Sequence, residues 1–199
     1  MSSASEMLMA RVRAAEKKEL ALLDHENPAE IGRHARTQML LYVLADNLPE
    51  ARFLWRRTAE EVKKSSSELQ TAWAVVTSLW ERSDVPNGLR LLAESEWTPE
   101  MTSFVAETLE ELRRREADLV GAVYTRISLK DLATALFLPE DQTLALCQQR
   151  HWPIEEGIVK PKRHITPDDS FDGTNHLNNI AAILTQLTTD PVPDLTVAH

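Results

Sequence analysis

The chain has 199 residues and a formal net charge of −9, and 43% of its residues are hydrophobic. This is enough apolar material to pack one large domain or two small ones, and the acidic balance disfavours binding to nucleic-acid phosphates or anionic membranes. A single cysteine, Cys147, excludes an internal disulfide bond, and no apolar run approaches the roughly 20 residues of a membrane span.

The N-terminal sequence MSSASEMLMARVRAAEKKEL leads into the first predicted helix, over residues 5–23. It has no uninterrupted apolar stretch and no cleavage-like site, so it does not have the pattern of a secretory signal. Together with the low cysteine content, this predicts a cytoplasmic and nuclear location. A second helix is expected over 28–45, because Pro28 suits a first helical turn.

Two helical hairpins are predicted in the next part of the chain. In DNLPEARFLWRRT, residues 46–58, one helix ends and another opens at Pro49. A helix over 67–82 followed by SDVPNGLRLLAES repeats this pattern, with Pro86 lying 37 positions after Pro49. Helix pairs that recur at this period indicate a short stack of TPR-like repeats.

A small domain with a different character follows. The spacing predicts a long helix over 99–127, a helix over 129–137 and another after Pro139. In HWPIEEGIVKPKRH we expect two short strands around Glu156-Gly157. Helices followed by a β-hairpin predict a winged helix. The residues expected to form its core are Leu136, Leu138, Leu144 and Trp152. The apolar face of the long helix is expected to consist of Leu109, Leu112, Leu119, Val120, Val123 and Tyr124.

The C-terminal residues predict one more helix after a linker. Its apolar side chains recur at three- and four-residue spacing, as on an amphipathic helix, and they are Leu177, Ile180, Ile183, Leu184 and Leu187. The complete expectation is a mainly α protein with TPR-like repeats over 1–112 and a winged helix over 113–163. A linker over 164–175, a C-terminal bundle helix over 176–189 and a flexible tail over 190–199 complete it.

The predicted helix-turn-helix raises the question of DNA binding. A DNA reader presents polar and basic residues at the start of its second helix, whereas this helix opens with Glu140 and Asp141. Two basic clusters, at 113–115 and 160–163, could form a patch for RNA or an acidic partner. Neither has interleaved aromatic residues, and we favour a solvated helix face and a wing loop.

Catalytic, metal-binding and cofactor-binding patterns are not found in the sequence. Six histidines are scattered without metal-ligand spacing, there is no glycine-rich phosphate loop, and Cys147 lies beside apolar Leu146. Trp73 and Trp80 share a helix face and are expected to pack between repeat helices. The sequence therefore predicts no enzyme, no cofactor and no metal site.

Three stretches of the chain resemble the PCI-domain family, and within it the eighth-subunit family of the COP-nine signalosome. They are LLYVLADNLPEARFLWRRT at 40–58, SSSELQTAWAVVTSLWER at 65–82 and RRREADLVGAVYTRISLKDLATALFLPEDQTLALCQQRHW at 113–152. The resemblance covers about residues 38–188. It implies a PCI domain, in which helical repeats precede a winged helix and a terminal helix.

The same resemblance implies a non-catalytic scaffold in a complex that removes a ubiquitin-like modifier from cullins. The implied partners are other PCI subunits, with the third subunit as the expected neighbour, and a terminal helical bundle. By position, Ile158 and Val159 would belong to the edge of the wing, and the five residues of the final stripe would face the bundle. No nucleic acid, membrane or small-molecule substrate is implied.

Two alternatives stay open at this point. One is another short PCI protein, such as the homologous subunit of the proteasome lid or subunit k of translation initiation factor three. The other is a winged helix that binds nucleic acid through its basic clusters.

Overall fold

The computed structural model describes residues 3–22, 27–81 and 84–162. All of these residues belong to one compact unit, Met1–Arg163. The predicted linker, final helix and tail lie outside the described residues, and so do Leu177, Ile180, Ile183, Leu184 and Leu187. None of the described helices is both long and apolar enough to cross a membrane.

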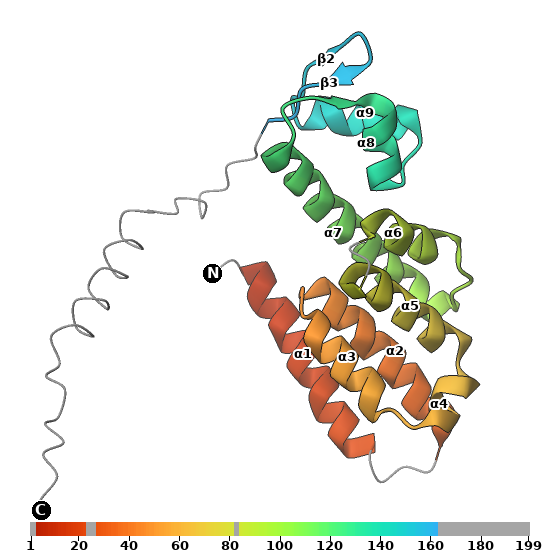
Figure 1. The fold of residues 1–199 in the computed structure, drawn as a ribbon. Helices are drawn as coiled ribbons and strands as arrows, with labels where there is room; N and C mark the ends of the chain where they lie inside the picture. Colours follow the sequence, from red (N-terminus) through yellow and green to blue (C-terminus); the bar gives the residue numbers. More distant parts are fainter. Residues whose placement is uncertain (1–2, 23–26, 82–83, 163–199) are drawn as a thin grey trace, which may run out of the picture. The chain divides into compact units, whose positions relative to one another are not determined.

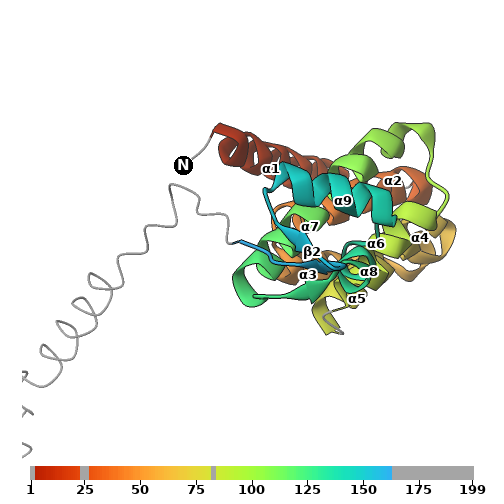
Figure 2. The same cartoon turned by 90° about the horizontal axis from the view of Figure 1, so that it is seen from above.

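The N-terminal part is a stack of helices (Figures 1 and 2). Its elements are α1 (Ser3–Leu22), α2 (Pro28–Leu44), α3 (Leu48–Arg57), α4 (Glu60–Ser65), α5 (Ser67–Glu81) and α6 (Val85–Glu94). Helix α2 packs against α1, α3, α4 and α5, and α5 packs against α6. The helices α3 and α6 start at equivalent places in the two predicted hairpins, which confirms both hairpins.

Local signals in the sequence explain where these helices begin. Asn27 accepts a hydrogen bond from the Ala29 backbone N–H, and Asp84 accepts one from Asn87. Each bond satisfies a backbone donor that has no partner inside the helix. Proline occupies the first or second position of α2, α3, α6 and α7, where its missing N–H costs nothing.

Helix α7 (Pro99–Val123) belongs to both parts of the described chain. Its first half, through Met101, Val105 and Leu112, joins the repeat core. Its second half, through Ala117 and Val120, joins a smaller core. A change of packing partners thus occurs inside one continuous helix, close to the boundary predicted at 112/113, although the domain boundaries themselves stay predictions.

The small domain is a winged helix in the order β1 (Ile127–Ser128), α8 (Leu129–Leu136), α9 (Glu140–Gln149), β2 (Ile154–Glu155) and β3 (Ile158–Val159). Leu136 and Trp152 are buried in its core as expected, and Leu138 packs partly buried against it. The other buried core residues are Leu132, Cys147 and Val159. The fold class is therefore confirmed as mainly helical, with repeats followed by a winged helix.

Two expectations about the long helix are wrong. It ends at Val123, and Ile127, expected at its end, begins a strand. The run of β-branched and aromatic residues from Val123 to Ile127 favours extended backbone over helix. In addition, Leu119, Val123 and Tyr124 are exposed, since the small domain packs on the other face of α7, through Ala117 and Val120.

Two further packing expectations are also wrong. Leu144 is exposed because the buried residues of α9 are Thr143 and Cys147, on a neighbouring face. Trp73 does pack between repeat helices, where it stacks on Trp55. Trp80, one residue from the end of α5, extends past that seam and is 41% exposed.

Candidate functional site

The wing of the small domain is built around a tight turn. Glu156 and Gly157 both have positive φ, at 51° and 78°, which is the backbone of a two-residue hairpin turn that matches strand twist. The turn joins β2 to β3 as the sequence predicts. Because side chains alternate along a strand, Val159 points into the core and is fully buried, whereas Ile158 points outward and is 39% exposed.

Strand β3 is the middle strand of the wing, because β1 pairs with it on one side and β2 on the other. The expected position of Ile158 and Val159 at the edge of the sheet is therefore wrong. The edges are β1 and β2, and the pairing of β1 takes up the backbone groups of β3 that an edge strand would leave free. Ile158 can contact a partner only through its outward side chain.

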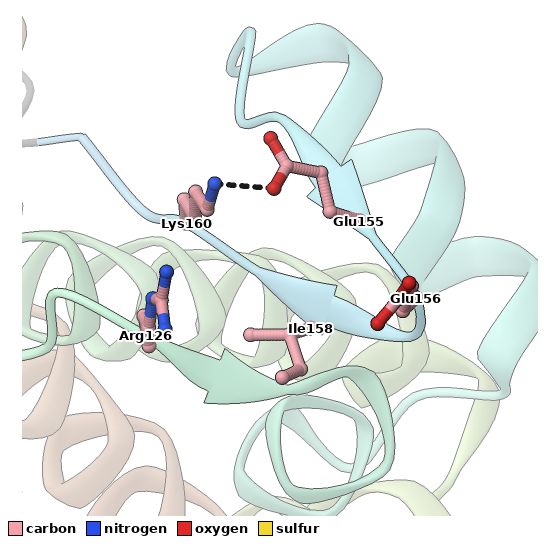
Figure 3. A pocket seen from close by; sticks show the side chains of 5 residues that line it. All are labelled: Arg126, Glu155, Glu156, Ile158 and Lys160. Atoms are coloured by element: carbon pink, nitrogen blue, oxygen red, sulfur yellow. Dashed lines mark hydrogen bonds and ion pairs between the residues drawn. The ribbon is translucent and has the colours of Figure 1, made fainter.

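A surface pocket of about 470 Å³ surrounds Ile158. Its other lining residues are Arg126, Glu155, Glu156 and Lys160, from the residue before β1, from β2 and its turn, and from the residue after β3. Figure 3 shows Arg126 and Lys160 toward one end, Glu156 at the other, and Ile158 between them. The pocket thus combines a cationic end, an aliphatic middle and an acidic end.

The charges of this pocket suit recognition better than acid-base chemistry. The Lys160 ammonium donates a hydrogen bond to the Glu155 carboxylate (Figure 3). This bond and the charges of Lys160 and Arg126 hold the pKa of Glu155 below its ordinary value. Glu155 is therefore ionised at neutral pH, whereas a general acid would need its pKa raised toward the working pH.

Arg126 is the pocket residue that the sequence analysis missed. Ser128 pairs with Ile158 across the sheet, and the alternation of side chains places Arg126 and Lys160 on the face that bears Ile158. This relation becomes visible only when residues 127–128 are read as a strand. The two-residue length of β1 gives the sequence too short a pattern to reveal it.

The basic cluster at 113–115 has a different role from the solvated face that the sequence favoured. Arg113 donates to the carbonyls of Leu136 and Phe137 at the end of α8, at 3.2 and 3.0 Å. Arg115 donates to the carbonyls of Val43, at 3.1 Å, and Leu44, at the end of α2. Since the last carbonyls of a helix have no partner inside it, these arginines cap two helices from outside.

Arg114 and Arg150 also pair with carboxylates of the same chain. Arg114 donates to Glu111 and to Asp118, each at 2.8 Å, and Arg150 donates to Asp118 at 2.6 Å. The hydrogen bond from Arg114, followed by the charge of Arg115, holds the pKa of Glu111 below its ordinary value despite partial burial. The first basic cluster therefore serves internal contacts and is not arranged to bind a phosphate chain.

Other candidate chemistry is scattered. Within residues 3–22, 27–81 and 84–162, no three potential metal ligands gather at one place. Cys147 is buried, and burial raises the pKa of its thiol, which lowers its reactivity. Glu140 and Asp141 are exposed in the first turn of α9, where a DNA reader would present basic side chains.

Comparison with known proteins is consistent with this architecture. The model of the CSN8/PSMD8/EIF3K family matches residues 34–169, which include most of the helical repeats and the winged helix. The chain is 29% identical over 127 residues to COP9 signalosome complex subunit 8 of Xenopus laevis. It is 33% identical over 135 residues to the subunit 8 of Danio rerio and 26% identical over 117 residues to that of Arabidopsis thaliana.

These matches leave part of each protein uncovered. They span 63%, 67% and 59% of this chain for the frog, zebrafish and plant proteins. They span 65%, 70% and 59% of the relatives themselves, so for the frog and plant proteins the matched part is less than two thirds of their length.

Proposed function

The chain belongs to the CSN8/PSMD8/EIF3K family, and from this premise we propose that it is a non-catalytic scaffold subunit of a COP9 signalosome. The observation that carries the proposal is the match of the family model across both the repeats and the winged helix, together with relatives that are named as subunit 8. None of these three relatives is named as a subunit of the proteasome lid or of translation initiation factor three, which are the two other branches of the family.

In this role the subunit contributes surfaces rather than reacting groups. Its partners are other PCI subunits, with the third subunit as the proposed neighbour, and it works in the cytoplasm and nucleus. Through the complex it takes part in removing a ubiquitin-like modifier from cullins, and so in regulating cullin-RING ubiquitin ligases.

The wing pocket supplies one proposed contact. Its cationic end, aliphatic middle and acidic end suit a partner segment with the opposite order of charges around an apolar side chain. The nucleic-acid alternative gains no support, because Arg113 and Arg115 cap helices and Lys160 pairs with Glu155.

The final helix supplies a second proposed contact, argued from sequence alone. Its stripe of Leu177, Ile180, Ile183, Leu184 and Leu187 fits a helical bundle made with other chains. A helix this short is marginal by itself in water, so the stripe needs a surface to cover it.

The experiment that tests the assembly role is affinity purification of the tagged full chain from its own cells, followed by mass spectrometry. Recovery of other PCI subunits, a metalloprotease subunit and cullins supports the proposal. Recovery of proteasome-lid or ribosomal initiation components instead would assign the chain to another branch of its family. Recovery of the chain with none of these would refute the scaffold role.

Two variants locate the contacts in the same experiment. Leu184→Asp with Leu187→Asp should release the chain from the complex, whereas Thr185→Asp with Gln186→Asp adds the same charge on the opposite helix face and should not. Ile158→Asp should weaken the wing contact while the free chain keeps its fold, because Ile158 faces outward. If the Leu184 and Leu187 variant and the Ile158 variant both retain the complete complex, neither surface is a contact.

A further inference from the structure

A second exposed surface lies on helices α3 and α5 of the helical repeats. Phe53 of α3 and Trp80 of α5 are 53% and 41% exposed. The Arg52 guanidinium lies 4.7 Å from the centre of the Trp80 ring. Arg56 follows Phe53 by three residues and is exposed on the same side of α3. We call these four residues the aromatic-arginine surface.

The helices beneath this surface are held firmly together. Trp55 of α3 and Trp73 of α5 stack with ring centres 4.9 Å apart and planes parallel within 1°. Arg52 precedes Trp55 in α3, whereas its contact Trp80 follows Trp73 in α5. The two helices therefore run antiparallel. Ala51 and Leu54 of α3 are buried on its inner side. Phe53 and Trp80 are thus presented by a rigid pair of helices, which lowers the entropy cost of binding.

The arginines of this surface lack the partners that neighbouring arginines have. Arg57, at the end of the same helix, donates to Glu19 at 2.5 and 2.8 Å. Arg36 of α2 pairs with the buried carboxylate of Glu68. Within the described ranges, Arg52 and Arg56 make no ion pair. In a chain with net charge −9, two cations without carboxylate partners beside exposed aromatic rings form a local positive apolar surface.

This combination has the composition of a protein-binding hot spot. Tryptophan, tyrosine and arginine dominate the residues whose truncation weakens protein interfaces, and aromatic residues are enriched at interface centres. An isolated exposed leucine needs no explanation, but two exposed aromatic rings on neighbouring helices do, one of them lying against an arginine. Water around Phe53 and Trp80 would be released on binding, and the arginines would gain carboxylate partners.

We propose that the aromatic-arginine surface binds an acidic amphipathic helix of a partner protein. The charge of the surface selects acidic side chains, and its exposed rings select apolar ones. A helix is the element that packs on the open face of two antiparallel helices, as α2 and α5 already do with their neighbours. Aliphatic residues one turn apart would contact Phe53 and Trp80, with glutamate or aspartate beside them facing Arg56 and Arg52.

Single-stranded nucleic acid is less suitable for this surface. Stacking of a base needs an open ring face, and one face of Trp80 is covered by Arg52. Two cations also give little attraction for a phosphate chain against an overall charge of −9. A second copy of this chain is an occupant that the experiment below distinguishes.

The experiment is a fluorescence titration of the full chain with a defined probe. The probe is a capped peptide of about 20 residues, long enough to form a helix, with leucines along one stripe and glutamates elsewhere. The same peptide with lysine in place of glutamate and a single-stranded oligonucleotide are tested beside it. We expect saturable binding of the acidic peptide, weakened by added salt, and no binding of the other two.

Matched variants connect the binding to the surface. Phe53→Ser with Arg56→Glu should weaken binding of the acidic peptide about tenfold or more, as for loss of a hot spot. Arg56→Glu alone should give a smaller loss, since both rings remain. Arg13→Glu with Leu20→Ser makes the same change of charge and a comparable loss of exposed apolar surface on α1, and should bind as the wild type does. Circular dichroism checks that each variant keeps its fold.

Four outcomes would overturn the proposal. They are no binding of the acidic peptide, equal binding by all variants, stronger binding of the oligonucleotide, and a wild-type dimer in sedimentation that the Phe53 and Arg56 variant abolishes. The last would mean that a second copy covers the surface. The titration needs no other subunit, so it can fail while copurification with a signalosome succeeds, and it can succeed where copurification fails.

Discussion

Arginines cluster in both α7 and α3, but the structure gives the two clusters different contacts. Arg113 and Arg115 of α7 turn toward the ends of α8 and α2 and donate to their carbonyls. Arg52 and Arg56 of α3 remain at the surface, one of them stacked on a tryptophan. Three arginines close together on a helix therefore do not by themselves indicate a binding surface. Their side chains can instead donate hydrogen bonds to carbonyls at the ends of neighbouring helices.

The largest effect is expected for the most deeply buried arginine. Arg36 pairs with Glu68, which also accepts a hydrogen bond from the Thr98 N–H at 2.6 Å, so this pair joins α2, α5 and the start of α7. Glu68→Ala would leave the buried Arg36 charge with only the exposed Glu100 carboxylate, at 3.8 Å, and should lower the free energy of unfolding by about 3–5 kcal/mol. Urea denaturation measures the loss. Glu94→Ala, which removes the exposed partner of Arg90, should cost less than about 1 kcal/mol.

Arg115→Ala tests the internal role of the α7 cluster. It removes charge-assisted hydrogen bonds to two carbonyls at the end of α2, and should lower the free energy of unfolding by about 1.5–3 kcal/mol. Arg115→Lys should not restore the whole loss, since one ammonium cannot reproduce a planar fork. Arg114→Ala, at the preceding position, is the control: Arg114 is itself exposed and pairs with the half-buried Glu111 and Asp118, so its loss should cost about 1 kcal/mol or less. Equal losses at 114 and 115 would contradict the capping role.

Acid sensitivity separates the paired arginine of α3 from its unpaired neighbours. Burial alone would raise the pKa of Glu19, but hydrogen bonds from Arg57 and Gln38 lower it overall. A carboxylate with a lowered pKa stabilises the fold above its unfolded-state pKa of about 4.5, and the contribution is lost as the pH falls further. Glu19→Gln should therefore reduce the slope of the free energy of unfolding against pH below about pH 5. The reduction should be less than about 1.4 kcal/mol per pH unit. Parallel curves for the two proteins would show that Arg57 and Glu19 do not couple.

The smallest effect on stability is expected at Arg56. Its side chain is exposed and makes no ion pair within the described residues, so Arg56→Ala should change the free energy of unfolding by less than about 0.5 kcal/mol. Thermal denaturation of this variant beside Arg115→Ala compares the two regions directly. A loss at Arg56 as large as that at Arg115 would mean that the α3 surface is a structural element.

The sequence predicts helix starts and the wing turn well because these depend on local chemistry. Proline at 28, 49, 86 and 99 and the Glu156-Gly157 turn act within a few residues of where they stand. Expectations about burial are less successful at Leu119, Leu144 and Trp80. Apolar spacing places these residues on a helix face, but it does not say whether another element covers that face.

The wing shows the same limit at the level of a sheet. Its hairpin is predicted from the turn, but its strand order depends on β1, two residues that lie 26 or more positions before β2. Pairing with β1 moves β3 from the edge to the middle and brings Arg126 beside Ile158. The predicted assignment of Leu177, Ile180, Ile183, Leu184 and Leu187 to a bundle stays a prediction.

The sequence by itself determined that this protein is a series of helices followed by a winged helix, since capping, proline placement and apolar period are encoded over short distances. Only the tertiary structure decided which cations and which apolar side chains remain available to partners. An arginine turns inward when carbonyls at a distant helix end lie within its reach, as at Arg115. Arg56, whose side chain makes no hydrogen bond or ion pair within the described residues, stays exposed.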